Sequence, residues 1–144
     1  MITISARVDN QHNQHDIVLQ TNANTHSITI PPRSTGFGSS ANGGELLFLA
    51  LATCYCNDLY REAAKRGITV RAVHVEVSGG FDEAPGAEAE NVTYRARVEA
   101  EASEAEILDL MRHTDTVAEV HNTLRTARGV TLAATEAVPV SAEA

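Results

Sequence analysis

The stretch from Glu45 to Lys65 contains neither Pro nor Gly and most constrains how this chain folds. A loop rich in Pro, Gly and Ser (residues 31–44) precedes it, and Gly67 follows it as a predicted helix C-cap. At ~1.5 Å per residue such a helix spans roughly 30 Å, about the width of a small domain. Its first half, ELLFLALATC, is apolar on nearly every side, so we expect it to be buried on most sides.

Short β-branched and alternating runs predict the strands that surround this helix. Residues 2–8, 16–20 and 26–30 are β-branched runs separated by polar residues, which indicates an antiparallel meander. Residues 70–79 and 91–100 alternate apolar with polar side chains, so each is expected to have one buried and one solvent-facing side.

The last third of the chain is predicted to hold two helices and a strand. Ser103 and Glu106 form a capping-box pattern that opens a helix through about His113. A second short helix is expected from Val117 to Arg125, and residues 129–138, GVTLAATEAV, are predicted to close the chain as a strand.

Together these elements predict an α+β fold in one domain spanning residues 1–144. The expected order is β-β-β-α-β-β-α-α-β, with a mostly antiparallel sheet packed on the long central helix. A helix that is apolar all round needs cover on more sides than one sheet supplies. A second copy of the chain is the simplest remedy, so we expect a two-fold homodimer.

Composition excludes several classes of function. The net charge of −8, with no basic cluster, argues against nucleic acid as a partner. The longest apolar run, Leu46 to Ala52, is far shorter than the ~20 residues that a membrane span requires, so no membrane partner is expected. The N-terminus, MITISARVDN, lacks the pattern of a signal peptide. We therefore expect a cytoplasmic protein with reduced thiols and no cofactor.

Both cysteines of the chain lie two positions apart within ALATCYCNDL. Each is either a small buried hydrophobe or a working nucleophile. At ~100° per residue, Cys54 and Cys56 lie roughly 200° apart around a helix, so they point to opposite sides. That geometry disfavours a disulfide between them. A metal site is also disfavoured, because its other ligands would have to come from His74, His113 or His121, whose spacing does not support one.

The segment NGGELLFLALATCYCNDLYREAAKRGITVRAVHVEV resembles the helical signature of the OsmC/Ohr family of thiol-dependent peroxidases, and the later HNTLR resembles that family's closing stretch. The resemblance implies an intertwined homodimer with two sites at its interface. It also implies reduction of small organic hydroperoxides, with an external dithiol as the reductant. Cys54 matches the family's peroxidatic cysteine, which becomes a sulfenic acid.

The resemblance carries over unevenly to the other site residues. Arg33 falls close to the arginine that holds the thiolate, and Arg61 is a weaker candidate on the same helix face as Cys54. The family's glutamate falls on Gly44, so Glu45 is its nearest candidate. Ala118 stands where the second, resolving cysteine is expected.

Two hypotheses follow from this comparison. In the first, Cys54, activated by Arg33 and with Glu45 as a further catalytic candidate, reduces hydroperoxides by a one-cysteine mechanism that an external thiol completes. In the second, the dimer keeps the fold but binds a small apolar ligand, or has a structural or stress role, without redox turnover.

Overall fold

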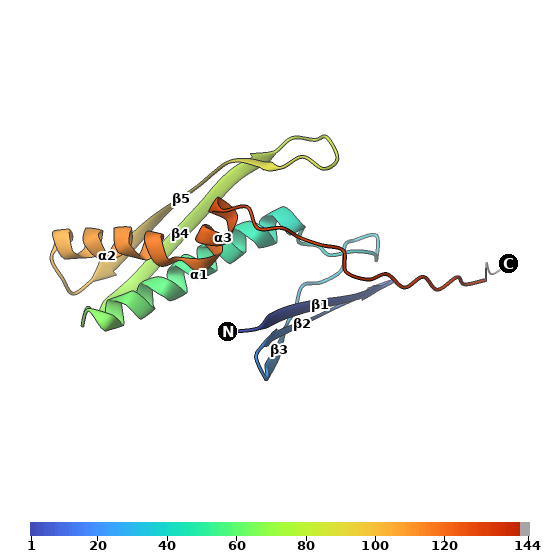
Figure 1. Cartoon of the computed structure of the whole chain (residues 1–144), viewed down its shortest axis with the longest axis horizontal. Helices are drawn as coiled ribbons and strands as arrows, with labels where there is room; N and C mark the ends of the chain where they lie inside the picture. Colours follow the sequence, from blue (N-terminus) through green and yellow to red (C-terminus); the bar gives the residue numbers. More distant parts are fainter. Residues whose placement is uncertain (142–144) are drawn as a thin grey trace. The chain divides into compact units, whose positions relative to one another are not determined.

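The computed structural model describes residues 1–141 and confirms the α+β class (Figure 1). The order of elements is β1 (Ile4–Gln11), β2 (Gln14–Thr21), β3 (Asn24–Ile28), α1 (Gly43–Lys65), β4 (Val70–Phe81), β5 (Ala89–Ala100), α2 (Glu104–Val117) and α3 (Glu119–Arg125). Helices and strands up to α3 follow the predicted order, because each carries a local periodicity that fixes its type.

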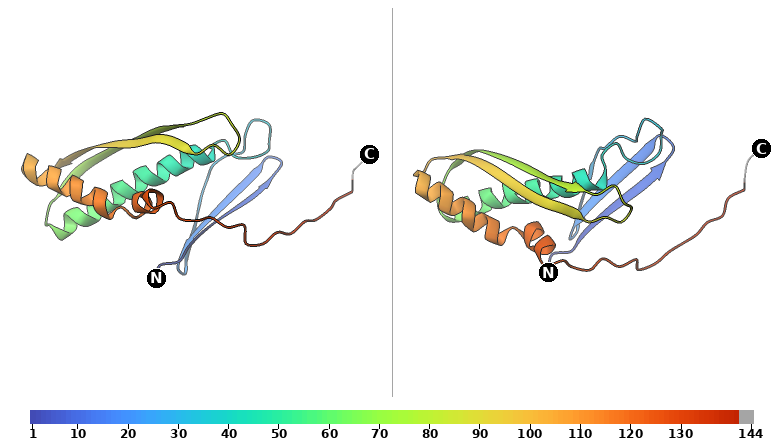
Figure 2. Two further views of the ribbon diagram at one scale, coloured as in Figure 1. Left: turned by 45° about the horizontal axis from the view of Figure 1, so that its top comes forward. Right: turned by 90° about the horizontal axis from the view of Figure 1, so that it is seen from above.

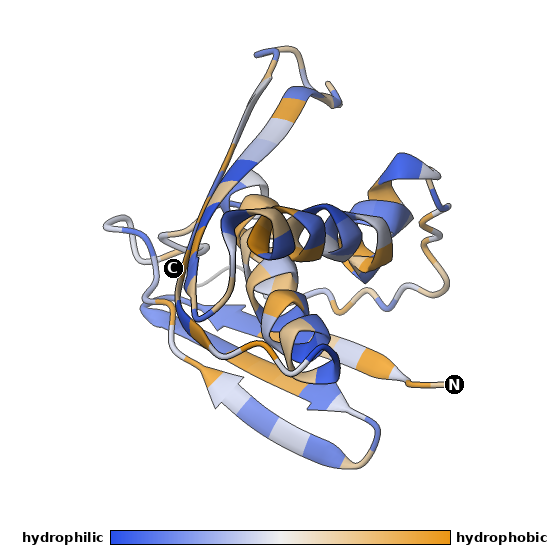
Figure 3. Ribbon diagram, turned by 90° about the vertical axis from the view of Figure 1, so that its left-hand side faces the viewer, coloured by the Kyte–Doolittle hydropathy of each residue, from blue (hydrophilic) through white to orange (hydrophobic). Residues whose placement is uncertain are grey.

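The first three strands form the predicted antiparallel meander in the order β1-β2-β3. Asn13 and Asn22 occupy the two connecting turns with φ of 57° and 52°. Asparagine tolerates this left-handed region because its short polar side chain can hydrogen-bond locally. These two tight turns therefore set the register of the sheet. Along the N-terminal strands, hydrophilic and hydrophobic residues follow one another (Figure 3).

Both ends of α1 are closed by local hydrogen bonds. The Asn42 side chain accepts from the Glu45 backbone N–H at 2.8 Å, and Glu45 Oε1 accepts from the Asn42 N–H at 2.9 Å. At the other end Gly67 has φ 66°, and the Ile68 N–H donates to the Ala63 carbonyl at 3.0 Å. This glycine-terminated geometry stops the helix where the sequence predicted.

The tertiary contacts divide the chain into two compact units. The first comprises Met1–Thr53 and Glu76–Arg95, and the second comprises Cys54–Val75 and the chain from Ala96 on. In the first unit, Phe48 of α1 stacks on Phe81 at the end of β4, with ring centroids 6.2 Å apart. These two units do not test whether the chain is a single domain, which stays a prediction.

The second unit holds the tightest packing around the C-terminal half of α1. Leu59 of α1 and Leu110 of α2 are completely buried. The Tyr55 hydroxyl donates to the Met111 carbonyl at 3.0 Å, which joins the same two helices. The α1 and α2 helices, together with α3, carry the side chains around Cys54 discussed below.

The α2 helix begins as predicted and ends later. Ser103 and Glu106 make both hydrogen bonds of the expected capping box. The helix continues past His113 to Val117, because neither Gly nor Pro interrupts it before Ala118 turns extended at ψ 111°. The third helix therefore starts at Glu119 rather than Val117.

The predicted final strand, residues 129–138, is not formed. This segment runs as an extended trace without secondary structure (Figure 2), and Val130 is 100% exposed. A strand needs a neighbour to complete its hydrogen-bond ladder, and no strand within residues 1–141 pairs with this segment. The local sequence of residues 129–138 is therefore not sufficient to predict a strand.

The first half of α1 is less buried than predicted. Leu51 is buried, whereas Leu49 is 57% exposed. A single chain covers only part of the circumference of this apolar helix, which is the physical reason for the difference. None of the helices in residues 1–141 has the length and hydropathy that crossing a bilayer demands.

Candidate functional site

Cys54 lies in the middle of α1 with its thiol between two carboxylates. The sulfur donates to Asp58 Oδ2 at 3.5 Å and approaches Glu119 Oε2 at 3.8 Å. Asp58 is one helical turn beyond Cys54, and residues four apart share one face of a helix. Glu119 comes from the first turn of α3. The second unit thus builds an acidic environment around a partly exposed thiol.

Arg61 forms ion pairs with both of these carboxylates. Its Nη1 lies 2.9 Å from Glu119 Oε1 and 3.1 Å from Asp58 Oδ1. The same guanidinium donates through Nε to Glu62 at 2.9 Å. Arg61 therefore offsets part of the negative charge that flanks the thiol.

Glu62 contacts several basic side chains next to this site. Its side chain is buried, and it also accepts from Lys65 Nζ at 3.0 Å and contacts His113 Nε2 at 2.8 Å. Hydrogen bonds from Arg61, Lys65 and His113 hold the pKa of Glu62 at about 2. The contact with His113 ties α1 to α2, which gives that histidine a structural role.

The electrostatics of the site oppose ionisation of the thiol. Burial raises the pKa of Cys54, and the charges of Asp58 and Glu119 raise it further, while the Val120 backbone N–H acts in the opposite direction. At neutral pH the Cys54 side chain is therefore predominantly the neutral thiol.

The two carboxyls beside the thiol titrate as a pair. Burial and the neighbouring Glu119 raise the pKa of Asp58 to about 6. The hydrogen bond with Asp58, together with Arg61, lowers the pKa of Glu119. The last proton of the pair accordingly resides on the buried Asp58 and leaves near pH 6.

Cys54, Asp58 and Glu119 are also the described residues that could hold a metal ion. Their donor atoms lie within 4.8 Å of one another, and thiolate and carboxylate ligands suit a zinc-like cation. Arg61 already supplies positive charge to both carboxylates, so this donor set does not require a metal for its charge balance.

The family model of OsmC-like proteins matches residues 36–133, which is more than half of the chain. The chain belongs to the OsmC-like family. No curated protein has a sequence that matches it.

Solved structures share the fold of this OsmC-like chain at low sequence identity. An OsmC-like protein from Mycoplasma pneumoniae is 18% identical with a TM-score of 0.60, covering 88% of this chain and 89% of that one. A hypothetical protein from Aquifex aeolicus is 13% identical with a TM-score of 0.61, covering 88% and 89%. The organic hydroperoxide resistance protein OhrB of Bacillus subtilis is 15% identical with a TM-score of 0.52, covering 87% and 92%. These likenesses establish the OsmC-like fold.

The other predicted site residues of this OsmC-like protein belong to the first unit, so each is described with its own neighbours. Arg33 Nε donates to the Ser39 carbonyl at 3.0 Å, within the loop that precedes α1. Glu45 forms the capping box with Asn42. Helix capping fully accounts for Glu45 here, and the roles of Arg33 and Glu45 at the thiol stay predictions.

Sequence reasoning missed Asp58 and Glu119. Asp58 carried a readable signal, because a carboxylate four residues after a helical cysteine shares its face. Glu119 carried none, since only the packing of α3 brings it to the sulfur. Ala118, which the resemblance predicts at the position of the resolving cysteine, is fully buried where α2 ends and α3 begins.

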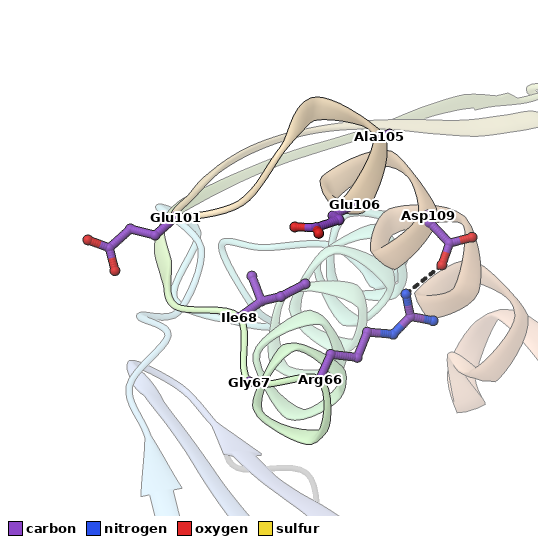
Figure 4. A pocket seen from close by; sticks show the side chains of 7 residues that line it. All are labelled: Arg66, Gly67, Ile68, Glu101, Ala105, Glu106 and Asp109. Carbon is purple, nitrogen blue, oxygen red and sulfur yellow. Dashed lines mark hydrogen bonds and ion pairs between the residues drawn. The ribbon is translucent and has the colours of Figure 1, made fainter.

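A separate cavity of about 540 Å³ lies in the second unit, where α1 ends and α2 begins (Figure 4). Arg66 pairs across it with Asp109 at 2.6 Å, while Glu101 points away from that pair. Glu101 pairs with Arg71 at 2.6 Å, and Glu106 caps α2. These ion pairs and caps already use the polar side chains around this cavity.

Proposed function

We propose that this OsmC-like protein reduces organic hydroperoxides through Cys54. The observation that carries the proposal is a partly exposed thiol at the centre of α1 in a chain of this family. Structural neighbours named as organic hydroperoxide resistance proteins support the same chemistry. The substrate class is therefore a small alkyl or aryl hydroperoxide.

The reaction needs one cysteine and two equivalents of external thiol. The sulfur of Cys54 attacks the distal peroxide oxygen, which forms a sulfenic acid and releases an alcohol. An external thiol then attacks the sulfenic sulfur to give a mixed disulfide and water, and a second thiol releases Cys54 in reduced form. Arg33 is the guanidinium that we propose to stabilise the thiolate during the attack.

A second candidate function is a non-catalytic OsmC-like dimer that binds a small apolar ligand or has a structural or stress role. The acidic surroundings of Cys54 favour it, because two carboxylates disfavour the thiolate on which peroxide reduction depends. This candidate requires that the thiol stay unreactive toward hydroperoxides.

Trapping the sulfenic acid separates the two candidates. We expect that cumene hydroperoxide followed by dimedone labels Cys54 and leaves Cys56 unlabelled, as measured by peptide mass spectrometry. Arg33→Met is expected to lower the yield of the Cys54 adduct, whereas Arg7→Met, another arginine of the first unit, is not. A wild-type protein that gives no adduct at any peroxide excess supports the non-catalytic candidate instead.

We further propose that the chain works as a homodimer in the cytoplasm. Large apolar side chains are exposed on several elements of the single chain, which monomers rarely tolerate as extended surfaces. Among them are Ile4, Val8, Leu49, Val92, Val130, Leu132, Val138 and Val140. Light scattering after gel filtration is expected to give twice the 15.4 kDa chain mass, and a single-chain mass at micromolar concentration contradicts the dimer.

A further inference from the structure

We infer that Asp58 is a catalytic residue of this reaction: its carboxylate takes the proton of the Cys54 thiol as the sulfur attacks, and delivers it to the leaving oxygen. The inference rests on the proposed hydroperoxide reduction and assigns the proton transfers within it. Hydroperoxide reduction through a neutral thiol needs both a base and an acid, and a single carboxyl can serve as each in turn.

The geometry gives each oxygen of Asp58 a separate contact. Oδ1 lies 3.1 Å from Arg61 Nη1, and Oδ2 accepts from the Cys54 thiol at 3.5 Å. The Asp58 side chain is 9% exposed, whereas the Glu119 side chain is 63% exposed and lies farther from the sulfur. The arginine thus fixes the buried carboxylate with one oxygen free for the thiol proton.

The groups that face Asp58 set the pKa of its carboxyl. They are Cys54 and Arg61 on its own helix and Glu119 on α3. Burial and Glu119 raise the pKa of Asp58 to about 6, whereas the hydrogen bond from Cys54 and the charge of Arg61 act in the opposite direction. This pKa is close to the pH at which a general base and acid is most efficient. An ordinary exposed aspartate has a lower pKa, so it is a weaker base and retains the proton less well before it is transferred to the leaving oxygen.

The step balances without any further reactant. The S–H bond of Cys54 breaks and its proton moves to Asp58 Oδ2, while the sulfur forms a bond to the distal peroxide oxygen. The O–O bond breaks, so sulfur is oxidised by two electrons and the peroxide is reduced. The alkoxide that leaves takes the proton from Asp58 and departs as the alcohol, which returns Asp58 to its carboxylate form.

A purely electrostatic role for Asp58 makes the opposite prediction. If the carboxylate only suppressed the thiolate, its removal would lower the pKa of Cys54 and accelerate every reaction of the sulfur alike. Iodoacetamide distinguishes the two roles, because its leaving iodide needs no proton whereas a leaving alkoxide does.

The test measures two rate constants at Cys54 in a Cys56→Ser background at pH 7: oxidation by cumene hydroperoxide and alkylation by iodoacetamide. We expect Asp58→Asn to lower the ratio of the oxidation rate to the alkylation rate by about 10²-fold or more. Asp109→Asn, which removes an exposed carboxylate paired with Arg66, is expected to leave the ratio unchanged. An unchanged ratio in Asp58→Asn overturns the inference while the proposed function stands.

The wild-type pH profile provides an independent measurement that no folding defect can affect. Oxidation is expected to rise through pH about 6, as Asp58 loses its proton, and then to level off until the thiol itself ionises. Alkylation is expected to rise continuously over the same range. An oxidation profile parallel to that of alkylation overturns the role of Asp58, and a wild-type thiol that cumene hydroperoxide never oxidises overturns the proposed function and this inference together.

Discussion

We expect Cys54→Ser to slow the consumption of cumene hydroperoxide, with dithiothreitol as the reductant, by roughly 10³-fold or more, the scale on which loss of a nucleophile slows other enzymes with covalent intermediates. A serine hydroxyl stays protonated at the pH where a thiol begins to ionise, and it cannot form the sulfenic acid on which turnover depends. Peroxide consumption and thiol oxidation are measured together, so that both halves of the reaction are followed.

Cys56→Ser is the matched control for this experiment. Both cysteines lie on α1, both are partly exposed, and their spacing directs them to different faces of the helix. We expect the Cys56→Ser protein to retain nearly all of the activity. Equal losses in the two variants would show that the thiols act together or that the helix is disturbed, and they would contradict a mechanism with one reactive cysteine.

The sequence predicted most of the fold because its signals are local. Ser103 and Glu106 cap α2 through hydrogen bonds that depend only on residues three apart, and Gly67 ends α1 through its own backbone conformation. Residues 129–138 were also predicted as a strand, yet they form none. A strand exists only with a partner, and the identity of that partner is a property of the whole assembly, which no local pattern encodes.

The candidate site was predictable only in part, for the same reason. The sequence and the family resemblance select Cys54, but part of the negative charge around its sulfur comes from Glu119, which lies 65 residues away and reaches it through the packing of α3. Glu45 carries a local signal that the prediction of its role did not use. The Asn42–Glu45 spacing is that of a helix cap, which the structure forms, and the catalytic role of Glu45 stays a prediction.

Truncation of a buried leucine in α2 is expected to have a large effect on stability. Leu110 of α2 has an exposed fraction of 0%, so Leu110→Ala removes buried methyl groups and leaves a cavity in the core of the second unit. We expect a loss of about 2–5 kcal/mol in the free energy of unfolding. Because single domains are commonly stable by only about 5–15 kcal/mol, this loss is a large part of the total. Urea titration followed by circular dichroism measures it.

Leu108→Ala on the same helix provides the control, because Leu108 is 39% exposed and the same atoms are removed from a site that water already reaches. Its expected cost is within about 0.5 kcal/mol, as for most surface substitutions. Both variants are compared at equal chain concentration, since association stabilises the folded state by mass action. If the two urea midpoints shift equally, then the packing of Leu110 does not support the Cys54 environment. The Tyr55–Met111 hydrogen bond and the contact of Glu62 with His113 are then the links between these helices that provide this support.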